Sequence, residues 1–143
     1  MVEILLQAGA DLRAVSNNGS TVLLMAVQSG HSKMCRYLIK RGADVTAKHN
    51  KKGGGALHKA CSSSSSSKKQ QRNNSSSMDM AAMLIAAGAD VNDTAAKDGS
   101  TPIHVAVQHK HHDIMLLLME KGAVVDAAKG DGTTALHLSL IHI

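Results

Sequence analysis

The stretch "GSTPIHVAVQHKHHDIMLLLMEKGAVV", residues 99–125, contains two apolar segments of helical length with a histidine-rich turn between them. Thr101 is a favourable N-cap, and Pro102 at the first helical position loses only an N–H that has no intrahelical partner. Three apolar residues then recur at helical spacing and form one stripe: Ile103, Ala106 and Val107. This pattern predicts a short amphipathic helix.

The second apolar segment, "HDIMLLLMEKG", predicts another helix that ends at Gly122. Glycine can adopt the left-handed conformation that closes many helices. The unit is therefore a pair of short helices followed by an extended loop. Neither helix can bury its apolar face alone, so neighbouring units have to complete the core.

The same two patterns recur along the chain. "QAGADL" at 7–12 returns as "KRGADV" at 40–45, "AAGADV" at 86–91 and "EKGAVV" at 120–125. In step with it run "GSTVLLMAV" at 19–27, "GGGALHKAC" at 53–61 and "GTTALHLSL" at 132–140. The glycines are spaced by 33, 46 and 34 residues: Gly9, Gly42, Gly88 and Gly122. The long interval indicates an insertion in one copy.

These residues resemble the ankyrin repeat, whose period is about 33 and whose signature is T-P-L-H-x-A. Leu24 stands in the place of the signature histidine in the first full copy, and Gly55 in the place of the threonine in the second. The resemblance implies an all-α solenoid of stacked helix-turn-helix units with extended loops. The predicted divisions are a partial repeat 1–17, repeats 18–50, 51–96 and 97–129, and a truncated repeat 130–143.

The composition suits thin layers. Tyr37 is the single aromatic residue, so the core must be built from aliphatic side chains, alanine and eight methionines. Alanines recur where the two helices of a unit are expected to approach most closely: Ala26, Ala60 and Ala106.

The histidines of residues 104–112 are explained largely by the repeat. His58, His104 and His137 occupy the signature position, where the resemblance implies hydrogen bonds within and across repeats. A shift of 80 residues places His111 on His31 and Lys110 on Gly30, in the turn between helices. His109 and His112 are a conceivable metal pair, but no adequate set of further ligands lies near them, so we expect solvated turn residues and no metal or cofactor.

The other motifs predict no catalysis. The chain has no G-x-S-x-G turn, and "KKGGGA" lacks the residue order of a phosphate loop. Cys35 and Cys61 form neither a disulfide framework nor a C-x-x-C spacing. The N-terminus is not signal-like and no apolar run reaches the length of a membrane span, so we expect a soluble protein of the cell interior, in the cytoplasm.

The net charge is +5. A modest basic excess without interleaved aromatics gives weak support for nucleic-acid binding, which stays an alternative. The tract "SSSSSSKKQQRNNSSS", residues 62–77, accounts for the 46-residue interval and predicts a disordered surface loop. The favoured interpretation of this tract is a low-complexity segment without a specific role, and the alternative is regulation through phosphorylation of its serines.

The ends do not look like capping repeats. "VEILLQAG" at 2–9 predicts a second helix without its first, and the fourth copy stops within its first helix, so we expect exposed apolar ends and a longer array. "LSLIHI" at 138–143 also resembles the translated end of a transposon-type sequencing adapter, which leaves open whether it is native.

The function predicted from the resemblance is a non-catalytic module that binds a protein through loop tips and first helices. A scaffold segment of a larger enzyme or channel is the other alternative. No small-molecule substrate is expected. The predicted partner-facing residues are Asn17, Asn18, Ser20, Gln28, Ser29, Lys51, Lys52, Gly54, Lys97, Asp98, Ser100, Gln108, His109, Gly130, Asp131 and Thr133.

Overall fold

The computed structural model describes residues 8–9, 11–48, 54–62, 75–95 and 97–141, and within them the regular elements are all helices. The helices are α2 (Val22–Gln28), α3 (Ser32–Lys40), α4 (Ala56–Ser62), α5 (Ser75–Ala86), α6 (Pro102–Gln108), α7 (His112–Glu120) and α8 (Ala135–Ile141).

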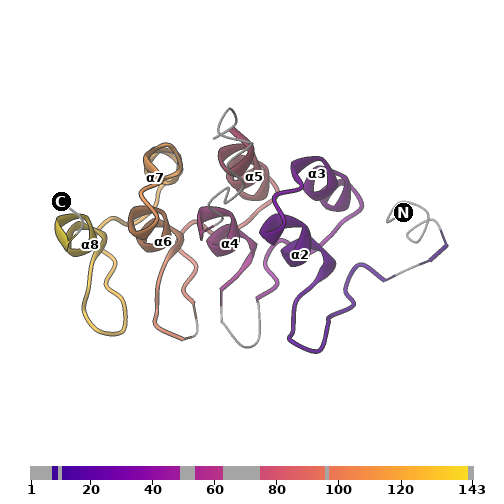
Figure 1. The fold of residues 1–143 in the computed structure, drawn as a ribbon, viewed down its shortest axis with the longest axis horizontal. Coiled ribbons are helices and arrows are strands. Elements are labelled where there is room, and N and C mark those ends of the chain that lie inside the picture. The colour runs from indigo at the N-terminus through magenta and orange to yellow at the C-terminus, as the bar shows by residue number, and fades with distance from the viewer. Residues whose placement is uncertain (1–7, 10, 49–53, 63–74, 96, 142–143) are drawn as a thin grey trace.

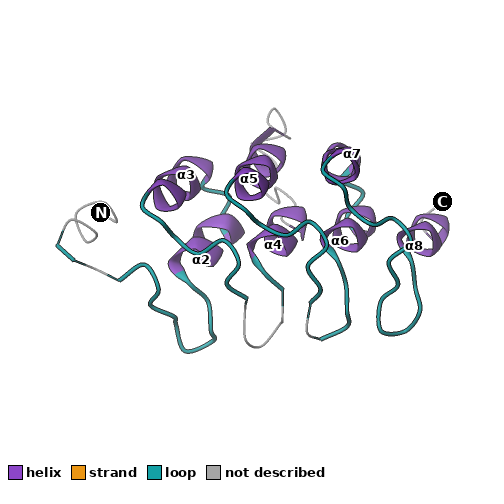
Figure 2. Ribbon diagram, turned by 180° about the vertical axis from the view of Figure 1, so that it is seen from behind, coloured by secondary structure: helices purple, strands orange, loops and turns teal. Residues whose placement is uncertain are grey.

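The helices form a stack of layers with three tiers (Figure 1). The first helices α2, α4, α6 and α8 make a row, the second helices α3, α5 and α7 make a parallel row above it, and the loops hang below. Figure 2 shows the same arrangement from behind. Each first helix packs on the first helix of the next layer, and each second helix on the next second helix. The predicted all-α solenoid is confirmed.

The first helices begin where the sequence predicts. The Thr21 hydroxyl accepts a hydrogen bond from the Leu24 N–H at 3.2 Å, which satisfies one of the free donors at the start of α2. Thr101 takes the same extended N-cap conformation before Pro102. Glycines with positive φ follow the second helices, among them Gly42 at +90° and Gly122 at +93°.

The structure shortens the irregular tract that the sequence predicts for residues 62–77. Helix α5 begins at Ser75, and Ser62 belongs to α4. The predicted tract is therefore too long at both ends. Serine is well suited to the first turn of a helix such as α5, and in the last turn of α4 the Ser62 hydroxyl donates to the Lys59 carbonyl at 3.0 Å. Residues 63–74 lie outside the described residues, as does most of the helix predicted at 2–9.

The core lies between the two helical rows and between layers. Leu38, Leu84 and Leu118, at the same position of α3, α5 and α7, are all 0% exposed. In α8 one position that is covered in the other first helices is open. Leu136 is 68% exposed, although the equivalent Leu23, Leu57 and Ile103 are 2–3% exposed.

Replacing Ala106 by leucine is expected to lower the free energy of unfolding by about 1–3 kcal/mol, because the added carbons must enter a packed site. Ala106 is 0% exposed, and its carbonyl accepts the His111 N–H at 2.9 Å in the turn to α7. Urea unfolding followed by circular dichroism measures the change. Val105→Leu, at the half-buried neighbouring position, is the control and should change stability little. Equal losses in both variants would contradict the close approach at Ala106.

Lys110 is strained in the turn between α6 and α7. Its φ is +59°, and among the described residues it is the one non-glycine residue with positive φ; the equivalent Gly30 has φ +75°. Lys110→Gly is therefore expected to raise the free energy of unfolding by about 0.5–1 kcal/mol. The substitution removes the cost of the left-handed conformation for lysine, but part of this gain is offset because glycine loses more backbone entropy on folding. The urea midpoint measures it. Lys121→Gly, at a position with φ −88°, should instead be destabilising, and a gain there too would refute the explanation.

Candidate protein-binding groove

Tight hairpins form the loop tips below the first helices (Figure 1). In the first full unit the Ser16 N–H donates to the Ser20 carbonyl at 2.9 Å. The same closure recurs before α8, where the Lys129 N–H donates to the Thr133 carbonyl at 2.8 Å. The loops therefore have a repeated, hydrogen-bonded shape that holds their exposed tips in register along the stack.

Asp98 fixes the loop before α6 to the loop before α8. Its carboxylate accepts hydrogen bonds from the Ser100 hydroxyl at 2.6 Å and the Ser100 N–H at 3.1 Å, and Lys129 Nζ lies 3.3 Å away. The Asp98 carbonyl accepts the Gly130 N–H at 2.9 Å. The Ser100 hydroxyl, followed by the Ser100 N–H and Lys129, lowers the pKa of Asp98 to about 2, so this carboxylate is charged and already paired.

The signature histidines join neighbouring layers. His58 Nδ1 accepts the Gly55 N–H at 3.3 Å, so the ring proton lies on Nε2, which donates to the Ser100 carbonyl of the next unit at 2.8 Å. His104 repeats this arrangement with the Thr101 N–H at 3.1 Å and the Thr133 carbonyl at 3.2 Å. Hydrogen bonds within and across repeats, implied by the resemblance, are thus present.

Acidification is expected to weaken the stack through these two histidines. Burial lowers the pKa of His58 and of His104 below the ordinary 6.5. Since the unfolded chain then binds more protons, their contribution to stability is complete above about pH 6.5 and is lost as the pH falls through the folded pKa values. Urea unfolding from about pH 7.5 down to pH 5 measures the slope.

The control for this pH dependence is a double variant, His58→Leu with His104→Leu. Leucine is suitable because the first full unit already has Leu24 at the equivalent position. The unfolding free energy of the double variant should fall less steeply with acid than that of the parent chain. Parallel slopes in the parent chain and the double variant would show that other groups cause the pH dependence.

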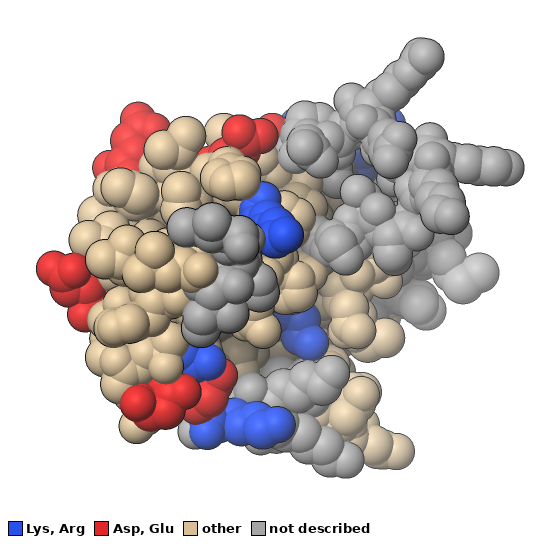
Figure 3. Space-filling model, turned by 60° about the vertical axis from the view of Figure 1, so that its left-hand side comes forward, with Lys and Arg blue, Asp and Glu red and all other residues tan. Residues whose placement is uncertain are grey.

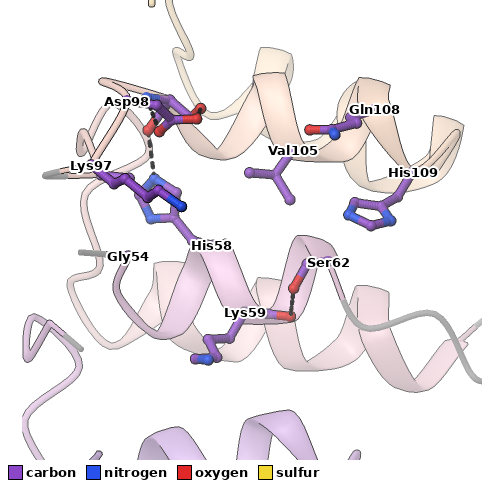
Figure 4. A pocket seen from close by; sticks show the side chains of 11 residues that line it. Gly54, His58, Lys59, Ser62, Lys97, Asp98, Val105, Gln108 and His109 are labelled. Carbon is purple, nitrogen blue, oxygen red and sulfur yellow. Dashed lines mark hydrogen bonds between the residues drawn. The ribbon is translucent and has the colours of Figure 1, made fainter. Parts of the chain in front are cut away.

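A pocket of about 250 Å³ opens between α4, α6 and the loop before α6. In Figure 4 Val105, Gln108 and His109 project from α6 toward α4, and Lys97 reaches in from the loop. The remaining lining residues come from α4 with its preceding loop and from the loop before α6: Gly54, His58, Lys59, Ser62, Ala95, Asp98 and Ser100. We use the word groove for the face of the stack formed by the first helices and the loop tips, on which this pocket is a described hollow.

The structure gathers part of the predicted partner-facing set in this groove. Lys97, Asp98, Gln108 and His109 are exposed and line the pocket. Ser20 and Ser100 are each only 6% exposed, which contradicts the expected exposure, because the loop folds back over both residues. Lys51 and Lys52 lie outside the described residues. The other predicted residues are at least partly exposed, along the loops before α2, α4 and α8 and at the end of α2: Asn17, Asn18, Gln28, Ser29, Gly54, Gly130, Asp131 and Thr133.

Five lining residues were not predicted to face a partner: His58, Lys59, Ser62, Ala95 and Val105. Of these, Lys59 and Val105 occupy the position marked x in T-P-L-H-x-A, as do Met25 and Leu138 in the other units. All four residues at x are at least partly exposed on the first helices. The signal that would have found Lys59 and Val105 is the change of chemistry at x, from methionine to lysine, valine and leucine, next to positions that keep a similar side chain in most copies.

Among the described residues, the histidine and cysteine side chains form no catalytic or metal-binding cluster. The ring centroids of His109 and His111 lie 6.2 Å apart, and nowhere in the described ranges do three or more His, Cys, Asp or Glu side chains gather to hold a metal ion. Burial raises the pKa of the Cys35 thiol to about 11 and of the Cys61 thiol to about 12, so both stay protonated and unreactive. Of the described helices, none is long and apolar enough to cross a membrane.

Comparison with known proteins agrees with this geometry. The family model "Ankyrin repeats (3 copies)" matches residues 1–70 and 69–142. The chain is 33% identical over 142 residues to the nuclear factor NF-kappa-B p105 subunit of Gallus gallus, covering 97% of the chain and 13% of that protein. The Mus musculus p105 subunit is 34% identical over 136 residues, covering 93% and 13%.

A shorter match joins 61 residues, 43% of the chain and 10% of the relative, to protein fem-1 homolog C of Homo sapiens at 43% identity. The chain thus spans about an eighth of the length of the p105 relatives that it matches, 13% in each case.

Proposed function

Because the chain belongs to the ankyrin-repeat family, we propose that it is a non-catalytic module that binds a protein partner along the groove above the loop tips. Ankyrin repeats are in general protein-interaction folds. The observation that carries the proposal is the pocket between α4 and α6, where exposed polar side chains from a loop and two helices converge. The side chains of Lys97, Gln108 and His109 are exposed there, so a partner can contact them without breaking a hydrogen bond between layers.

The groove also has the geometry that an extended peptide requires. First helices of successive layers lie side by side, with helix axes about 8–10 Å apart in packed structures. A strand-like segment of about 12 residues spans roughly 40 Å and therefore crosses three or four layers. Aromatic anchors are missing from the groove, so we expect a modest interface that depends on polar contacts.

Selection from a library of random linear peptides of about 12 residues on the immobilised chain tests this function. Enriched peptides should perturb the amide signals of α4, α6 and the loop 95–100 in NMR spectra. Gln108→Trp should block them, because Gln108 is exposed and lines the pocket. Glu120→Trp is the control, since Glu120 is exposed on α7, in the other row of helices.

The outcome that would sink this proposal is enrichment only of peptides that bind Gln108→Trp as tightly as the parent chain. A selection that enriches no peptide above an uncoated surface would sink it as well.

A second candidate is an interaction segment within a longer multidomain enzyme or channel. It is supported by the small share of the p105 relatives that the chain covers, 13% in each case. The uninterrupted parent reading frame tests it, and a frame that encodes no further domain would contradict it.

A further inference from the structure

We propose that the partner segment received by the pocket between α4 and α6 is acidic, an extended peptide with Asp or Glu side chains. This inference rests on the proposed function and specifies the chemistry of the partner. The pocket is too small for a typical small-molecule site, since its 250 Å³ falls below the roughly 300–1,000 Å³ of such sites. It suits one or two side chains of a peptide that lies along the groove.

The charge of the pocket favours an acidic segment. Lys97 contributes a cation from the loop and Lys59 a second from α4. Among the described residues of the lining the single carboxylate is that of Asp98, and its charge is balanced by Lys129 Nζ at 3.3 Å and by the two hydrogen bonds from Ser100. Lys97 forms no ion pair with any described residue, so its charge is available to a ligand.

The lining also offers hydrogen-bond groups beside the cations. The Gln108 amide and the His109 ring extend from the end of α6, and Val105 supplies an apolar side chain about one turn earlier on the same helix (Figure 4). A carboxylate near Lys97 can therefore be joined by backbone contacts to Gln108, as in other grooves that bind extended peptides. A positively charged side chain of a partner would be repelled by both Lys59 and Lys97.

A nucleic acid is acidic too, but the groove fits it less well. Single strands are held by stacking of bases on aromatic side chains, and Tyr37, the only aromatic residue of the chain, lies on α3 in the other row. In Figure 3 the described lysines and arginines on the visible face lie as separate spots, one of them against acidic side chains at the lower edge. A phosphate backbone requires a continuous basic track.

The test compares two double variants, each of which removes two lysine charges. Lys59→Gln with Lys97→Gln removes the cations of the pocket, and Lys33→Gln with Lys40→Gln removes two exposed cations of α3. Fluorescence anisotropy with peptides from the selection gives the affinities, and thermal unfolding confirms that each variant is folded. We expect groove-directed peptides of net negative charge, whose affinity falls about tenfold or more with the pocket pair and less than about twofold with the α3 pair.

Matched peptides with Asn and Gln in place of Asp and Glu should lose a similar factor. Groove-directed peptides that are neutral or basic would overturn the acidic chemistry while leaving the proposed function intact. Equal losses in both lysine pairs would overturn it as well, since they would show only long-range attraction. A labelled oligothymidine of about 20 nucleotides that binds more tightly than every peptide and is weakened by the pocket pair would assign the site to nucleic acid instead.

Discussion

Replacing Leu118 by alanine is expected to lower the free energy of unfolding by about 2–5 kcal/mol. Leu118 is 0% exposed in α7, which packs against both α5 and α6. The truncation removes buried carbons and leaves a cavity that rigid neighbours on two sides fill only in part. Urea unfolding monitored by circular dichroism gives the value.

Leu116→Ala is the matched control, because it makes the same chemical change two residues earlier in the same helix. Leu116 is 59% exposed, so its truncation should change the unfolding free energy by about 0.5 kcal/mol or less. If the two alanine variants lost the same stability, α7 would not present Leu118 to the core, and the packing of its layer would be refuted.

His58→Ala is expected to cost about 3 kcal/mol, because the Ser100 carbonyl loses one of its two donors, keeping only the Ala95 N–H, and the vacated ring leaves a cavity in the interface between layers. His58 is 6% exposed, and the Gly55 N–H at the start of α4 loses its acceptor as well. With both ring nitrogens hydrogen-bonded, His58 therefore stabilises the start of one layer and the contact of that layer with the next. Chemical unfolding near neutral pH, where His58 is uncharged, measures the loss.

His137→Ala separates these two contributions. His137 Nδ1 accepts the Thr134 N–H at 3.2 Å, as in the other copies, but its ring is exposed and no described carbonyl accepts from its Nε2. This variant should lose only a cap, about 1 kcal/mol. A loss as large as that of His58→Ala would mean that the bond between layers contributes nothing.

Much of the fold could be predicted from the sequence because the signals are local. Thr101, Pro102 and the apolar spacing after them predict the helix observed as α6, and the positive φ at Gly42 and Gly122 is where the repeated glycine indicates a helix end. Where the signal was ambiguous the prediction failed. The serines before Met78 are compatible with both a loop and the first turn of a helix, and the structure places Ser75 to Ser77 in α5.

The candidate site was predictable only in part. Lys97, Gln108 and His109 follow from their place in the repeat, whereas Lys59 belongs to the pocket because α4 and α6, 46 residues apart, lie side by side. Ser100 looks equally exposed in the sequence, yet the loop buries it and its carbonyl is taken by His58 of the preceding layer.

The sequence by itself therefore determined the helices, their caps and the number of residues between layers, since each depends on contacts within a few residues along the chain. Which side chains are covered and which line the groove was decided only by the tertiary structure. Burial of a position such as Leu57, or exposure of its equivalent Leu136, depends on the layer stacked beside it, and that neighbour is encoded tens of residues away.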